Sequence, residues 1–241
     1  MSDATILTID NADMAKFDAK AFKRNGIKAL VFKAHPKPGV VPGSKTSAKT
    51  ESQSSPTAEP VVAPSLVDPK IIADTTSAGL AYGVLLTLSD KMKDQLDLLP
   101  VGAPVFVEAK SGMKIADIDN AIQDIITVMG ADSPPSIVLK IDQKTAKEFE
   151  NVYDNELADW TSLWIIDEPK RDEPAQLTPE WPQATWPKWK MWEFGDLDLK
   201  ELGKYKASCF NGPDEDEARF FAGQAPSVAG AGGQLPESKS A

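Results

Sequence analysis

The segment Ala103-Pro104-Val105-Phe106-Val107-Glu108-Ala109-Lys110 decides the fold, because it is a short apolar run with one carboxylate near its end. Its valines and phenylalanine, which follow Gly-Ala-Pro, predict a buried β-strand. Side chains alternate between the two faces of a strand, so Phe106 and Glu108 point to the same side. Glu108 is therefore a candidate catalytic acid; the alternative is a solvated structural glutamate at a strand end.

Working outward from this segment, strands and helices alternate along most of the chain. Apolar runs predict further strands at 4–10, 27–34, 81–88, 135–142 and 162–167, and helical spacing or caps predict helices at 16–25, 68–77, 89–98, 115–129 and 145–153. This order is typical of parallel α/β units. We therefore predict an α/β fold in a single domain.

Two segments interrupt or follow this pattern. Residues 36–64 are rich in Pro, Ser, Thr, Lys and Gly and lack apolar periodicity, which predicts a flexible insertion. The alternative is a segment that becomes ordered when it binds a partner. Residues 223–241 are small and polar and predict a flexible tail, so the domain is expected to span residues 1–222.

Composition excludes several functions. The 241-residue chain is 41% hydrophobic and carries a net charge of −10, which argues against nucleic-acid binding and against docking to anionic membranes. The N-terminus shows no signal peptide and no apolar run is long enough for a membrane span, so we expect synthesis in the cytoplasm. One cysteine excludes an intrachain disulfide, and the lone His35 excludes a His-rich metal site and a Ser-His-Asp triad elsewhere. We expect no metal and no cofactor.

Tryptophans crowd one region near the C-terminus. Trp181, Trp186, Trp189 and Trp192 lie within twelve residues, with prolines between them. Aromatic faces cover the apolar faces of sugar rings, so these side chains could line a glycan groove. The alternative, which composition leaves equally open, is that they pack a loop-rich corner. Our glycan-binding candidates are Trp186, Trp189, Trp192 and Trp164.

Six motifs occur in an order that resembles the glycoside hydrolase family 25 muramidases, the lysozyme-like enzymes of bacteria and their phages. They are Thr8-Ile9-Asp10, 25–34 (NGIKALVFKA), 78–83 (AGLAYG), Leu163-Trp164-Ile165, 189–194 (WKMWEF) and Phe210-Asn211-Gly212. The resemblance covers most of residues 5–222, apart from the insertion. It implies an irregular (β/α) barrel of the TIM-barrel type, with the site at the C-terminal ends of the strands.

The chain departs from the family at the catalytic motif. Active members carry Asp-x-Glu on the strand that aligns with 105–108; Glu108 matches the Glu, but Phe106 stands at the Asp position. The resemblance implies that Glu108 would protonate the leaving oxygen, and Phe106 could raise its pKa by desolvation. Asp10 matches the opening acid of the family and could face Glu108 across the cleft. Other site positions are replaced at Leu85-Leu86, Glu193 and Lys206.

These departures lead us to expect a muramidase-like protein whose hydrolysis is impaired or lost. It would act as a structural or glycan-binding module of a phage particle, with peptidoglycan or another glycan and other virion proteins as partners. The alternative is an active N-acetylmuramidase with Glu108 as general acid and Asp10 as second carboxylate.

Overall fold

The computed structural model describes most of the chain between residues 5 and 222. The described residues are 5–10, 17–34, 66–89, 92–96, 99, 104–129, 136–150, 152, 156–167 and 178–222. The insertion expected at 36–64 and the tail expected at 223–241 lie outside these residues, and so does His35. The predicted domain boundaries therefore stay predictions.

Eight strands form a closed barrel in which each strand pairs with its neighbour in sequence and the last returns to the first. The strands are β1 (Ile6–Ile9), β2 (Ala29–Lys33), β3 (Ala81–Thr87), β4 (Val105–Glu108), β5 (Ile137–Asp142), β6 (Thr161–Ile166), β7 (Trp189–Leu199) and β8 (Gly203–Phe210). Neighbouring strands from β1 to β7 are parallel, whereas β8 runs antiparallel to both β7 and β1. The predicted α/β barrel is confirmed, and its irregularity is this reversed eighth strand.

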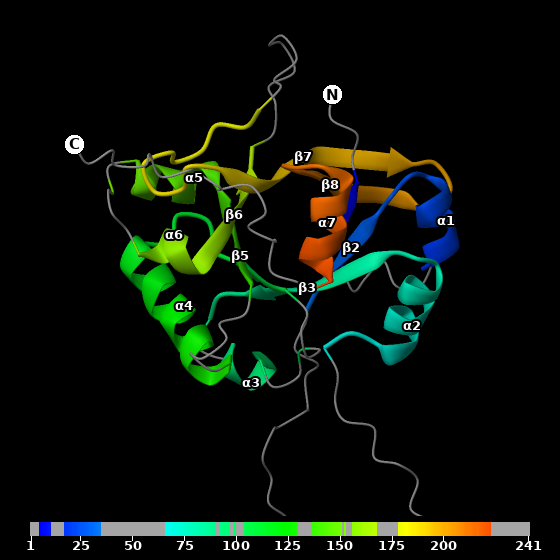
Figure 1. Ribbon diagram of the computed structural model, residues 1–241, viewed down its shortest axis with the longest axis horizontal. Coiled ribbons are helices and arrows are strands. Elements are labelled where there is room, and N and C mark those ends of the chain that lie inside the picture. The colour runs from blue at the N-terminus through cyan, green and yellow to red at the C-terminus, as the bar shows by residue number, and fades with distance from the viewer. Residues whose placement is uncertain are drawn as a thin grey trace, which may run out of the picture.

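Helices surround the barrel, with α1 and α2 on one side and α4, α5 and α6 on the other (Figure 1). The helices are α1 (Ala19–Arg24), α2 (Pro69–Ser77), α3 (Lys93–Leu96), α4 (Ile115–Met129), α5 (Gln143–Ala146), the 3-10 turn η2 (Lys147–Phe149), α6 (Leu157–Trp160) and α7 (Asp214–Phe221). Helix α4 has the predicted bounds, because its isoleucines recur at helical spacing and bury one face.

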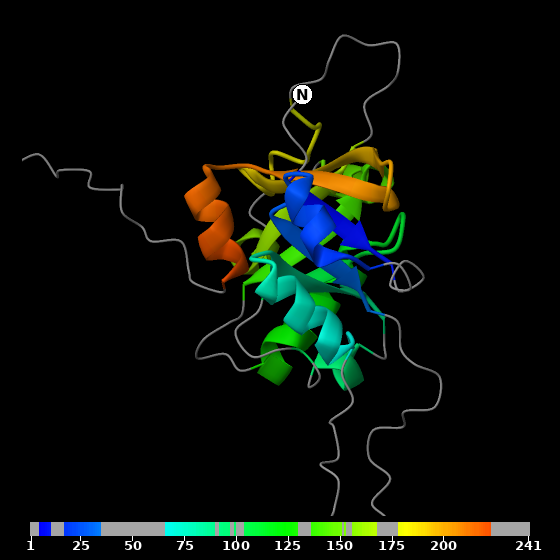
Figure 2. The same cartoon turned by 90° about the vertical axis from the view of Figure 1, so that its right-hand side faces the viewer.

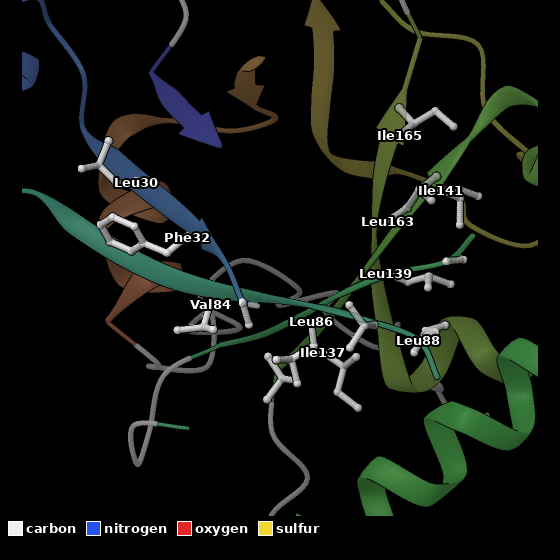
Figure 3. Close-up of a cluster of buried hydrophobic side chains, with 14 of the residues drawn as sticks. Leu30, Phe32, Val84, Leu86, Leu88, Ile137, Leu139, Ile141, Leu163 and Ile165 are labelled. Atoms are coloured by element: carbon white, nitrogen blue, oxygen red, sulfur yellow. The ribbon is translucent and has the colours of Figure 1, made fainter. Parts of the chain in front are cut away.

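The buried strand residues form two layers, because successive side chains alternate between the helices and the barrel axis. On β4, Val105 and Val107 belong to the outer layer and Phe106 to the inner one. Figure 3 labels ten outer-layer residues, which lie on β2, β3, β5 and β6 or, for Leu88, directly after β3: Leu30, Phe32, Val84, Leu86, Leu88, Ile137, Leu139, Ile141, Leu163 and Ile165.

Phe106 fills the interior of the barrel. Its side chain is fully buried; its ring lies edge-on to Trp164, with centroids 5.8 Å apart, and is stacked on Phe221 at 5.7 Å. A Cβ atom at Gly83 on β3 would lie only 2.2 Å from the Phe106 ring. Glycine at position 83 therefore makes the space that the ring occupies.

Helix α7 closes the end of the barrel at which the parallel strands begin; Figure 2 shows it apart from α1 and α2. Its Phe220 and Phe221 join the inner layer. Lys28, which precedes β2, lies 2.6 Å from Asp214 Oδ1 and 3.7 Å from Glu217 Oε2. The opposite end, where the parallel strands finish, is the mouth.

Candidate functional site

Four charged side chains meet inside the barrel near its mouth. Lys33 ends β2, Glu108 ends β4, Lys140 lies on β5 and Glu193 on β7. Lys33 Nζ is 2.7 Å from Glu108 Oε2, and Lys140 Nζ is 3.2 Å from Glu108 Oε1 and 2.7 Å from Glu193 Oε2. We call these four residues the charged cluster.

The charged cluster extends from the solvent into the core. The side chain of Lys33 is 33% exposed and that of Glu108 is 18% exposed, whereas Lys140 and Glu193 are almost fully buried. Lys140 Nζ also lies 4.6 Å from the centre of the Trp164 ring, a cation–π distance. A buried charge needs this kind of partnership, since an unpaired one costs several kcal/mol.

The ion pairs set the protonation of Glu108. Burial on its own would raise the pKa of this carboxyl group, but Lys140 and Lys33 together outweigh burial and hold the pKa below its ordinary value. Burial therefore acts in the direction expected of Phe106, but the two lysines outweigh it, so the net shift of the Glu108 pKa is downward. The ring packs toward Trp164 and Phe221, and the two ammonium groups decide the charge of Glu108.

An ionised Glu108 can accept hydrogen bonds but cannot donate a proton at neutral pH. Glu193 is a second carboxylate, and because Lys140 Nζ contacts both acids, its Oε2 lies no more than about 6 Å from Glu108 Oε1. The Lys140 ammonium, however, contacts both of these oxygens. The Lys140 ammonium therefore already supplies the positive charge that these two carboxylates could stabilise.

Asp10 is exposed directly after β1, and β1 pairs with β2, the strand that ends with Lys33; Ile9 is in register with Phe32. Whether Asp10 can serve as the second carboxylate stays a prediction. The other replaced positions also serve roles in the scaffold. Leu85 packs in the inner layer, and Lys206 on β8 pairs with Asp196 at 3.2 Å.

The four tryptophans proposed as glycan-binding residues are buried. Trp164 is 0% exposed, Trp186 and Trp192 are each 3% exposed, and Trp189 is 9% exposed. Trp186, Trp189 and Trp192 therefore do not line an open groove, because their rings pack in the core instead of facing solvent. Two of the six tryptophans reach the surface: Trp181 is half-buried and Trp160 is exposed.

Lys33 and Lys140 are the site residues that sequence reasoning missed. Each is the single basic residue of a mostly apolar strand, and each lies at a position whose side chain points into the barrel. A lysine at such a position needs a buried partner. That signal, read together with the inward Glu108, could have indicated the charged cluster.

Among the residues that the structure describes, no three His, Cys, Asp or Glu side chains are grouped so that they could hold a metal ion. Within the same residues, no helix has the length and apolar character required to cross a membrane.

No family model and no curated protein matches the sequence. Several solved structures match the fold, and three of them are described here. GHIP, a glycosyl hydrolase 25 of Streptococcus pneumoniae described as a virulence factor participating in host cell invasion, has a TM-score of 0.59 at 10% identity and covers 91% of this chain and 92% of its own. The CTP1L endolysin has a TM-score of 0.55 at 15% identity, with coverages of 90% and 69%. The catalytic domain of endolysin ply40 from bacteriophage P40 of Listeria monocytogenes has a TM-score of 0.54 at 9% identity, with coverages of 93% and 100%.

The closed eight-stranded barrel, surrounded by helices, is an irregular α/β barrel. Its particular fold is that of glycoside hydrolase family 25, and the three matched structures carry this fold over almost the whole chain. The resemblance inferred from the six sequence motifs is confirmed at the level of the fold.

Proposed function

We propose that this protein recognises cell-wall glycan without hydrolysing it, as a muramidase-like structural or glycan-binding module of a phage particle. The observation that carries the proposal is the pair of ammonium groups on Glu108, one on each carboxylate oxygen. Glycoside hydrolysis needs a proton donor and a negative charge beside the developing oxocarbenium ion. Here the candidate donor is held ionised, and Phe106 stands where the family carries the second acid.

Lys140 adds a further obstacle to hydrolysis. Its ammonium lies between the carboxylates of Glu108 and Glu193, so a substrate cation at this place would meet a positive charge in a poorly hydrated site. Like charges repel strongly where water is excluded. Enzymes of this chemistry rely on the opposite arrangement, a fixed negative charge directed at the reacting centre.

The phage-particle part of the proposal draws support from two matched structures that are endolysins, one of them from bacteriophage P40. On this proposal, other virion proteins are partners as well. Peptide mass spectrometry of purified particles should detect the chain; its absence from the particles would contradict this part alone.

A second candidate function, hydrolysis with Glu108 as the acid, is favoured by the proximity of Glu193. In that case Glu193 or Asp10 would supply the second carboxylate. The substrate would have to displace Lys140 from Glu108, which would raise the pKa of Glu108 and allow it to hold a proton.

One experiment separates the two functions. Wild type and Glu108→Gln are incubated with purified peptidoglycan, released muropeptides are measured, and sedimentation with the insoluble sacculi is followed. We expect no release above a protein-free blank from either protein and co-sedimentation of both. Clear wild-type turnover that is abolished in Glu108→Gln would establish the hydrolase instead, and failure to sediment would contradict glycan recognition.

A further inference from the structure

A pocket lies on the flank of the barrel, outside the charged cluster. It encloses about 450 Å³, within the range of about 300–1,000 Å³ typical of small-molecule sites. One wall is formed by α5 and the turn after it, including Gln143 and Glu150, and the other by residues 178–183. Gln143 directly follows β5, so the pocket begins beside the mouth and runs down the outer side.

Hydrogen bonds hold the two walls of this flank pocket in place. Gln143 Nε2 donates to the carbonyl oxygen of Glu180 at 3.0 Å, which joins one wall to the other. The backbone N–H of Glu180 donates to Asp167 Oδ2 at 2.8 Å, which ties the second wall to the end of β6. A pocket with fixed walls loses little entropy when it binds a ligand.

Trp181 is the aromatic residue of the flank pocket. Its Nε1 donates to the carbonyl oxygen of Trp186 at 3.0 Å, so the polar atom of the indole is already bonded. The half-buried Trp181 therefore lines the pocket with its apolar ring, beside Pro179 and Pro182. A flat apolar surface of this kind matches the C–H face of a pyranose ring.

The polar residues of the flank pocket restrict the charge of the ligand. Glu150 and Glu180 are carboxylates, Gln143 and Gln183 are amides, and no lysine or arginine lines the described walls. Carboxylates accept hydrogen bonds from hydroxyl or ammonium groups and repel anions. The lining therefore suits a polyol that is neutral or carries an amine.

We propose that the flank pocket is a saccharide subsite for a neutral or amine-bearing pyranose. The inference deepens the proposed glycan recognition and rests on it. It places the contact with glycan on Trp181, Glu150 and Gln183, separate from Glu108. Saccharides that carry carboxylates are excluded by Glu150 and Glu180.

The test is calorimetric titration of the full chain with three tetrasaccharides of different charge. The probes are tetra-N-acetylchitotetraose, its fully de-N-acetylated form and tetragalacturonate. We expect the two chitin-derived probes to bind and tetragalacturonate to fail. Trp181→Ala should weaken binding about five- to tenfold, the usual scale of one aromatic contact, and Trp181→Phe should weaken it less.

Trp160→Ala is the matched control, because it removes a surface tryptophan from outside the flank pocket and should leave affinity unchanged. Glu150→Gln tests the same wall at an exposed position that can hardly disturb folding; it should reduce the preference for the amine-bearing probe. Equal affinity in wild type, Trp181→Ala and Glu150→Gln would overturn the subsite while leaving glycan recognition intact. No binding of either chitin-derived probe to wild type would also overturn it, and sedimentation with sacculi would then decide glycan recognition separately.

Discussion

Lys140 shows how one residue changes the chemistry available to its neighbours. With an apolar residue at position 140, the barrel would hold two nearby carboxylates that share a site and push one pKa upward, as catalytic acid pairs do. With lysine, both acids are paired and Glu108 stays ionised. The same two carboxylates therefore belong to a salt-bridge network instead of an acid–base pair.

Gly83 is predicted to be a position that tolerates no side chain. Gly83→Ala places a methyl group against the Phe106 ring, and overpacking of this kind typically costs about 1–3 kcal/mol. Urea unfolding should show this loss in the free energy of unfolding. The double variant Gly83→Ala, Phe106→Leu should lose less than the sum of the two single changes, because leucine frees the space. Simple additivity would contradict the close approach.

The site was only partly predictable at the level of single residues. Glu108 could be identified because a carboxylate at the end of an apolar strand is visible in the sequence. Its partners Lys33 and Lys140 leave a weaker signal, a lone inward-facing lysine on each strand, and their contact with Glu108 depends on how neighbouring strands are arranged in the barrel. The prediction of glycan-binding tryptophans failed because their close spacing in the sequence is typical of an exposed aromatic cluster, whereas long-range packing buries four of the six tryptophans.

Elements with strong local signals were predictable. Helix α4 and the first six strands carry clear apolar periodicity and lie where the sequence placed them. No strand or helix was predicted after residue 168, but this region contains β7, β8 and α7. In β7 the alternation is broken at a bulge between Glu193 and Gly195, and its antiparallel pairing with β8 is not visible in local sequence.

Helix α7 is predicted to stabilise the barrel through one face only. Phe221 is 6% exposed and stacks on Phe106, so Phe221→Ala should reduce the free energy of unfolding by about 3–5 kcal/mol. Arg219 lies on the same helix and is 41% exposed, with only surface ion pairs, so Arg219→Ala should change stability by less than about 0.5 kcal/mol. Thermal unfolding of both variants checks this, and equal effects would mean that α7 does not close the barrel.

The charged cluster contributes to the stability of the whole molecule at acid pH. The direction of the Glu108 pKa shift fixes the sign of this contribution. The pKa of Glu108 is lowered in the folded state, so its contribution is fully present above the unfolded value of about 4.3 and is lost as the pH falls through the folded value. Burial raises the pKa of Glu217 in the folded state. Its ionisation therefore disfavours the folded state, and this penalty is relieved as the pH falls.

Comparing wild type with Glu108→Gln isolates the contribution of Glu108 to the free energy of unfolding. At pH 7 wild type should be the more stable of the two, and the difference in the free energy of unfolding should narrow as the pH falls below about 4. Denaturant unfolding at a series of pH values measures this difference. A gap that stays constant from pH 7 to pH 3 would contradict ionic stabilisation by Glu108.

The closure of the barrel by α7 also has a consequence for orientation. Strand β1 begins, and α7 packs, at the end opposite the mouth, so anything joined before Thr5 or after Ala222 is attached at that end. A copy tethered through either end would present its mouth outward. On the proposed function, an array of such copies would meet a polymeric glycan at many flank pockets, and avidity would then turn individually weak contacts into firm adhesion.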